Sequence, residues 1–135
     1  MRSTISVMNA KGGVGKSTLV LSLAETLSAC HGKRVLVIDS DAHASISNML
    51  MRPDWVQTFQ AQGRSVVDYL IAAVLKNESV PWTAYVSAGV SDVDDARAVG
   101  LMPGGGHLTL FEREVSKAGL EARLRQAVRT LLAET

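Results

Sequence analysis

The sequence predicts an α/β fold in which a mostly parallel sheet is flanked by helices. A strand-like segment at residues 3–8 is followed by a glycine-rich loop and then by a helical pattern over residues 17–30. A nearly continuous apolar run, RVLVID, comes next at residues 34–39. Strand, helix and strand in so short a stretch make a βαβ unit, whose crossover we expect to be right-handed.

The first three elements follow from their residue types and spacing. Ile5 and Val7 supply the β-branched side chains that favour a strand over Ser3–Met8. Apolar residues recur at helical spacing from Leu19 to Leu27, and Gly32 is typical of a helix end, so we expect a helix over Ser17–Cys30. RVLVID has few polar residues, as in a strand that is buried on both faces.

The rest of the chain predicts further helices and short strands. A serine before an apolar run with an acid three residues later is close to a capping box, and Ser65 and Asp68 have that spacing. Gly119 separates the last two helical patterns. The expected helices cover 54–62, 65–75, 108–117 and 120–133, and the expected strands cover 81–87 and 99–102, with loops at 89–98 and 103–106.

Composition limits the protein class. With 135 residues we expect one domain, and 47% hydrophobic and 20% charged residues are ordinary for a folded protein. A net charge of +1 excludes a global field that would draw the chain to nucleic acid or to a membrane surface. The single cysteine, Cys30, excludes an internal disulfide, and we expect it to be buried. Without a signal-like or membrane-length apolar run, we expect a cytoplasmic protein with no membrane partner.

The glycine-rich loop KGGVGKST predicts a phosphate-binding site for a nucleoside triphosphate and Mg²⁺. Backbone N–H groups of such a loop, together with the start of the following helix, surround the phosphates. Lys16 is expected to reach the β- and γ-phosphates, Ser17 to ligate Mg²⁺, and Thr18 to contact the α-phosphate. The predicted nucleotide-binding residues are Lys11, Gly12, Gly13, Val14, Gly15, Lys16, Ser17 and Thr18.

The loop resembles the deviant Walker A motif, KGGxGK[ST]. Ala10 replaces the glycine of the common P-loop pattern, and Lys11 precedes the glycine pair. This form is found in ParA-type partition ATPases, MinD proteins, arsenite-pump ATPases and nitrogenase iron proteins. The resemblance implies a P-loop NTPase fold of the SIMIBI type. It also implies that Lys11 reaches across a dimer interface to the partner's nucleotide, the alternative being a solvated loop lysine.

Two acids follow the apolar strand, at Asp39 and Asp41. Ligands of open α/β sheets bind beyond the carboxyl ends of the strands, so both acids are expected near the phosphates. Alternatively, Asp41 caps a helix that begins near Ser45. The stretch resembles the D-x-D-P-Q switch of ParA-type ATPases. The resemblance implies that Asp39 lies near the magnesium water shell and that Asp41 orients the attacking water, as a catalytic residue with Lys11 and Lys16.

The chain also departs from that family. Ala42 and His43 replace the proline and glutamine of the switch, which is expected to alter turnover or dimer coupling. We find no apolar strand that ends in a Walker B aspartate. The resemblance therefore implies that residues 1–135 are the N-terminal part of a single ParA-like domain, truncated before the Walker B strand. We expect a fragment, or a natural truncation that needs a partner, with exposed apolar surface.

The resemblance favours an ATP-binding partition ATPase that segregates plasmid or chromosome DNA. Such a protein forms a nucleotide-dependent homodimer and responds to a ParB-like partner, and its non-specific DNA contacts would lie mostly in the missing half. MinD would need an amphipathic membrane helix, and an iron protein would need cluster cysteines. The alternative is a nucleotide-binding or interaction module that does not hydrolyse ATP and docks onto a full-length ATPase.

Overall fold

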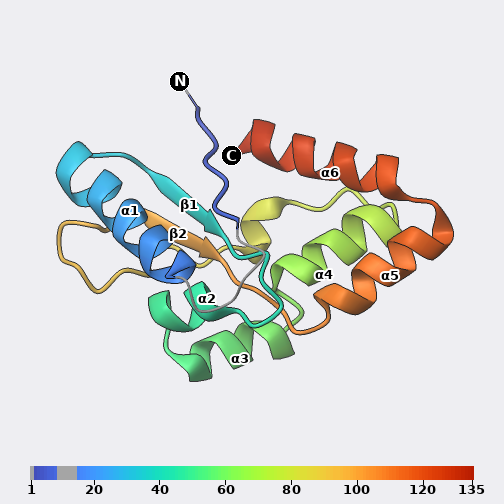
Figure 1. The fold of residues 1–135 in the computed structure, drawn as a ribbon, viewed down its shortest axis with the longest axis horizontal. Coiled ribbons are helices and arrows are strands. Elements are labelled where there is room, and N and C mark those ends of the chain that lie inside the picture. The colour runs from blue at the N-terminus through green and yellow to red at the C-terminus, as the bar shows by residue number, and fades with distance from the viewer. Residues whose placement is uncertain (1, 9–14) are drawn as a thin grey trace.

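The computed structural model describes residues 2–8 and 15–135, and Figure 1 shows the arrangement of their helices and strands. The elements in chain order are α1 (Lys16–His31), β1 (Val35–Ile38), α2 (Ser45–Leu50), α3 (Pro53–Ala61), α4 (Val66–Leu70), the π-helix η1 (Ile71–Leu75), the 3₁₀-helix η2 (Trp82–Tyr85), β2 (Val99–Met102), α5 (Leu108–Ala118) and α6 (Glu121–Glu134).

The sheet consists of β1 and β2, which pair in parallel with Val35 opposite Val99 and Ile38 opposite Met102. Ser87 adds a single antiparallel bridge to Leu101, through N–H···O bonds of 2.8 and 2.9 Å. The parallel α/β architecture predicted from the sequence is therefore confirmed.

Helices cover both faces of this small sheet. Val37, Val99 and Leu101 pack into one apolar core with residues of α1, α2 and α3. Ile38 and Met102, whose side chains alternate with these along the strands, join a second core with residues of α4, α5 and α6. The near-continuous apolar run of β1 is explained by this burial on both faces.

Two predicted strands are wrong. Residues 2–8 form no strand, and Ile5 and Met8 are 62% and 85% exposed. A β-branched composition favours a strand only where a neighbouring strand provides pairing and packing, and β1 pairs with β2 among the described residues. Within 81–87, Pro81 lacks an N–H and starts the 3₁₀-helix η2 instead, so only Ser87 pairs with β2.

The exposure of the side chains differs from the prediction at Cys30 and agrees with it for the exposed apolar residues. Cys30 is exposed, because it lies on the outer side of the last turn of α1, and its predicted burial is wrong. Exposed apolar surface is confirmed, with Leu19, Trp55 and Leu110 each more than half exposed. Within 2–8 and 15–135, no helix combines the length and the apolar character that a membrane span requires.

The predicted capping box at the start of α4 is confirmed. The Ser65 N–H donates to Asp68 Oδ2 at 2.9 Å, and the Asp68 N–H donates to Ser65 Oγ at 3.3 Å. The Val66 N–H donates to the Pro103 carbonyl at 2.7 Å, so the capped end of α4 is held against the loop that follows β2.

We expect Ser65→Ala to lower the free energy of unfolding by about 1 kcal/mol, since the mutation removes a side-chain cap from a buried helix end. Urea denaturation followed by circular dichroism measures this change. Ser116→Ala, at an exposed position inside α5, is the control and should change stability by less than about 0.5 kcal/mol. Equal effects of the two substitutions would contradict a role for the cap.

Candidate functional site

The N-terminus of α1 has the features of an anion site. Gly15 precedes the helix with φ +83°, a left-handed conformation that glycine adopts without strain. No side chain of residues 2–8 or 15–135 caps this end, and the first turn contains no acidic residue. The N–H groups of a first helical turn have no partner within the helix, and the helix dipole is positive there. A phosphate group fits such a position without further requirements.

Lys16 and Asp41 meet beside this helix end. Lys16 Nζ lies 3.7 Å from Asp41 Oδ2, and the two side chains are 33% and 28% exposed. A partly exposed ion pair of this length contributes little to stability. An anion that approaches Lys16 can therefore replace Asp41 at little cost. The pair also brings the predicted phosphate lysine next to the second acid of the predicted switch.

Asp39 has a different environment from Asp41, although they are two residues apart. Its side chain is 2% exposed. Oδ1 accepts the Asp41 N–H at 3.0 Å, while Oδ2 accepts the Ser47 N–H at 3.1 Å and the Ser47 hydroxyl. These donors replace the water that the carboxylate loses on burial. Asp39 is thus fixed in orientation at the carboxyl end of β1.

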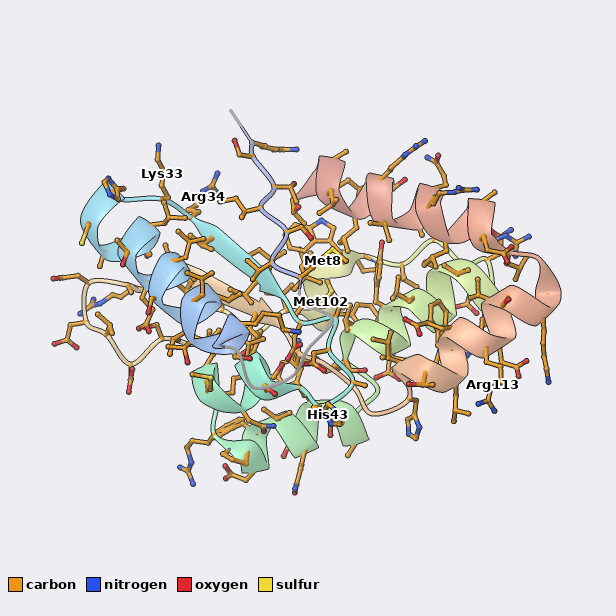
Figure 2. The ribbon with its side chains drawn as sticks, in the orientation of Figure 1. Met8, Lys33, Arg34, His43, Met102 and Arg113 are labelled. Carbon is orange, nitrogen blue, oxygen red and sulfur yellow. The ribbon has the colours of Figure 1, made fainter. Side chains whose placement is uncertain are left out.

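Hydrogen bonds to Asp41 hold the segment between β1 and α2. Asp41 Oδ1 accepts the His43 N–H at 3.0 Å, and the Asp41 carbonyl accepts the Ala44 N–H at 3.0 Å. Ala44, not Asp41, is the N-cap residue of α2, so the capping alternative for Asp41 is wrong: its carboxylate faces Lys16 and the His43 N–H instead. His43 is exposed and is labelled in Figure 2.

The structure describes only part of the predicted site. Residues 9–14, which include the predicted site residues Lys11, Gly12, Gly13 and Val14, lie outside the described residues. Gly15, Lys16, Ser17 and Thr18 form the start of α1, as predicted. Among the described residues, the Asp39 carboxylate accepts hydrogen bonds from Asp41 and Ser47. Ser47 was missed, because nothing in the sequence links a serine on α2 to this acid.

The oxygen ligands present suit Mg²⁺, which prefers carboxylate, hydroxyl, phosphate and water oxygens. Ser17 lies in the first turn of α1, and Asp39 and Asp41 follow β1. In the described part of the chain, no group of three or more His, Cys, Asp or Glu side chains is arranged to hold a metal ion. Mg²⁺ at nucleotide sites commonly takes one or two protein ligands and completes its shell with phosphates and water.

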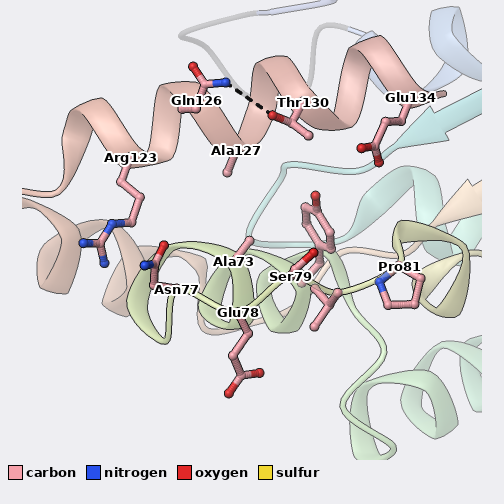
Figure 3. Close-up of a pocket in the computed structure, with 12 residues that line it drawn as sticks. Ala73, Asn77, Glu78, Ser79, Pro81, Arg123, Gln126, Ala127, Thr130 and Glu134 are labelled. Carbon is pink, nitrogen blue, oxygen red and sulfur yellow. Dashed lines mark hydrogen bonds between the residues drawn. The ribbon is translucent and has the colours of Figure 1, made fainter.

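A separate pocket of about 520 Å³ lies between α6 and the segment from η1 to Pro81 (Figure 3). Tyr69 lines it, and burial, followed by the nearby Glu134 carboxylate, raises the pKa of Tyr69. Arg123 on α6 donates to the Val74 carbonyl at 3.0 Å across one end. None of the described site residues at the start of α1 or after β1 lines this pocket, so we do not assign it to phosphate binding.

Comparisons with known proteins match this chain to nucleotide-binding proteins, which fits the anion site at the start of α1. Residues 5–131 match the family described as the CobQ/CobB/MinD/ParA nucleotide binding domain. The chromosome partitioning protein ParA of Caulobacter vibrioides is 46% identical over 46 residues, which is 34% of this chain and 17% of that protein. An iron-sulfur cluster carrier protein of Methanococcus maripaludis is 43% identical over 53 residues, 39% of this chain and 18% of the relative.

A putative replication protein A of Rhizobium rhizogenes is 58% identical over 43 residues, 32% of this chain and 10% of that protein. These similarities span less than a fifth of the length of each relative. No solved structure matches the chain. The family match, by contrast, extends over nearly all of the 135 residues and includes the phosphate loop, both strands and the acids that follow β1. The chain therefore belongs to the CobQ/CobB/MinD/ParA family of nucleotide-binding domains.

Proposed function

We propose that this chain binds ATP with Mg²⁺ and provides the nucleotide site of a partition ATPase that segregates plasmid or chromosome DNA. The observation that supports this most is the ion pair of Lys16 and Asp41 beside the N-terminus of α1, which joins the phosphate-binding motif to the acids after β1. The similarity to the chromosome partitioning protein ParA of Caulobacter vibrioides supports partition as the activity.

In this proposal each described residue has a distinct task. The first-turn N–H groups of α1 and the Lys16 ammonium bind the phosphates and neutralise their charge. Ser17 and Asp39 hold Mg²⁺ or its water shell, and a bound Mg²⁺ would supply charge stabilisation at the β- and γ-phosphates. Asp41, once released from Lys16 by the triphosphate, orients the attacking water.

Nucleotide binding and hydrolysis measured side by side on the 135-residue chain test the proposal. Binding of ATP that requires Mg²⁺, together with slow release of phosphate, is the expected result. Binding without phosphate release would instead support the alternative of a module that docks onto a full-length ATPase. Failure of the chain to bind ATP would contradict both functions.

A nucleotide-dependent homodimer is the second part of the proposal, and it depends on Lys11. We expect Lys11→Ala to weaken dimerisation by at least about 30-fold in the presence of a non-hydrolysable ATP analogue, because a buried charge contact across an interface is worth several kcal/mol. Sedimentation velocity measures the dimer. Nucleotide affinity of the monomer should change by less than about threefold.

Lys33→Ala is the matched control, since Lys33 is an exposed loop lysine after α1 and is expected to leave dimerisation unchanged (Figure 2). A Lys11→Ala chain that dimerises as well as the unchanged chain would show that Lys11 is only a solvated lysine.

A further inference from the structure

The Ser47 side chain connects the two strand ends at the site. Its hydroxyl donates to Asp39 Oδ2, and its Oγ accepts the Gly104 N–H at 2.9 Å. Ser47 lies on α2 and is completely buried, while Gly104 lies in the loop after β2, 57 residues further along the chain. One hydroxyl therefore links β1, α2 and the loop after β2.

The direction of this hydroxyl is fixed by its neighbours. A backbone N–H can only donate, so the Gly104 N–H occupies a lone pair of Ser47 Oγ, and the hydroxyl proton has to point elsewhere. It points to Asp39 Oδ2, which also accepts the Ser47 N–H at 3.1 Å. Among the described residues, Ser47 thus contributes two of the three donors that hold the Asp39 carboxylate, with the Asp41 N–H as the third.

Gly104 also lies close to the Asp39 carboxylate. A Cβ at this position would lie 3.1 Å from both Cγ and Oδ2 of Asp39, which is closer than ordinary contact. The loop itself is held in turn, because Gln60 Nε2 of α3 donates to the Gly104 carbonyl at 3.0 Å. The position of Asp39 therefore depends on a rigid three-element contact and not on β1 alone.

We propose that Ser47 is a positioning residue for the Mg²⁺-nucleotide site: it fixes the rotamer of Asp39 and ties it to the loop after β2. This inference rests on the proposed function, since it assumes that Asp39 acts in the magnesium shell. Ser47 is too buried to touch a ligand, so it acts through Asp39. Groups that orient metal-binding carboxylates commonly change metal affinity by 10- to 100-fold when removed.

The test is a Mg²⁺ titration of the 135-residue chain with a fixed concentration of a fluorescent, non-hydrolysable ATP analogue. Ser47→Ala is expected to raise the Mg²⁺ midpoint by about tenfold. Binding of the analogue in EDTA should change by less than about twofold, because the α1 N-terminus and Lys16 are untouched. Ser47→Thr, which retains the hydroxyl, should restore most of the Mg²⁺ response.

Further variants separate positioning from stability. Ser47→Cys keeps the size of the side chain but replaces the hydroxyl with a poor donor, so it gives the same readout if the alanine variant does not fold. Ser28→Ala is the control, since Ser28 is also a buried helical serine but makes no hydrogen bond to the Asp39 carboxylate in the described structure.

A folded Ser47→Ala or Ser47→Cys chain with the Mg²⁺ midpoint of the unchanged protein would overturn the inference and leave nucleotide binding intact. Failure of the unchanged chain to bind the analogue would instead overturn the proposed function, and this inference with it.

Discussion

Lys16→Ala is expected to reduce the affinity for Mg²⁺-ATP by at least about 100-fold. A lysine between two phosphates makes charge-assisted hydrogen bonds worth about 1.5–3 kcal/mol each, and the loss of two exceeds the 2.8 kcal/mol or so that corresponds to 100-fold. Isothermal titration calorimetry measures the affinity directly. The fold should tolerate the change, since Lys16 is partly exposed and its ion pair with Asp41 is long.

Two comparisons make this prediction specific. Lys33→Ala removes the same charge at an exposed position beyond the other end of α1, and should leave the affinity within about twofold. The free energy of unfolding of Lys16→Ala should differ from that of the unchanged chain by less than about 1 kcal/mol. A Lys16→Ala chain that binds ATP normally would remove the phosphate loop from the proposed mechanism.

The helices could be predicted well from the sequence because their signals are local. Apolar spacing and a terminal glycine place α1, and the capping box of Ser65 and Asp68 places α4. The two strands that form, β1 and β2, were also predicted. The segments 3–8 and 81–87 were predicted as strands and are not, because a strand depends on a partner that its own residues do not specify.

The sequence predicted which residues belong to the site, but not the contacts among them. Lys16 and Asp41 were both expected near phosphate, and the structure brings them together. Asp39 and Asp41 look equivalent in the sequence DSD, yet one is buried and the other partly exposed. Ser47 of α2 donates to Asp39, and the Gly104 N–H in the loop after β2 donates in turn to Ser47 Oγ. No local pattern encodes such contacts.

Asp39→Asn is expected to destabilise the fold by about 3 kcal/mol, although the two side chains have nearly the same shape. Both carboxylate oxygens of Asp39 accept backbone N–H groups, from Asp41 at Oδ1 and from Ser47 at Oδ2. An asparagine amide offers one oxygen and one NH₂ group. In either orientation the NH₂ faces an N–H donor, and a buried unpaired donor costs about 1–3 kcal/mol, in addition to the lost charge-assisted bonds.

Urea denaturation of Asp39→Asn should show a midpoint about 1–2 M lower, given the slope expected for a chain of this size. Asp41→Asn is the matched control two residues away: its carboxylate is partly exposed and pairs with Lys16, so stability should change by less than about 1 kcal/mol. If Asp41→Asn nevertheless abolishes hydrolysis, then the two acids have different roles: Asp39 stabilises the fold at the site, and Asp41 contacts the ligand. Equal losses of stability in both variants would contradict this division.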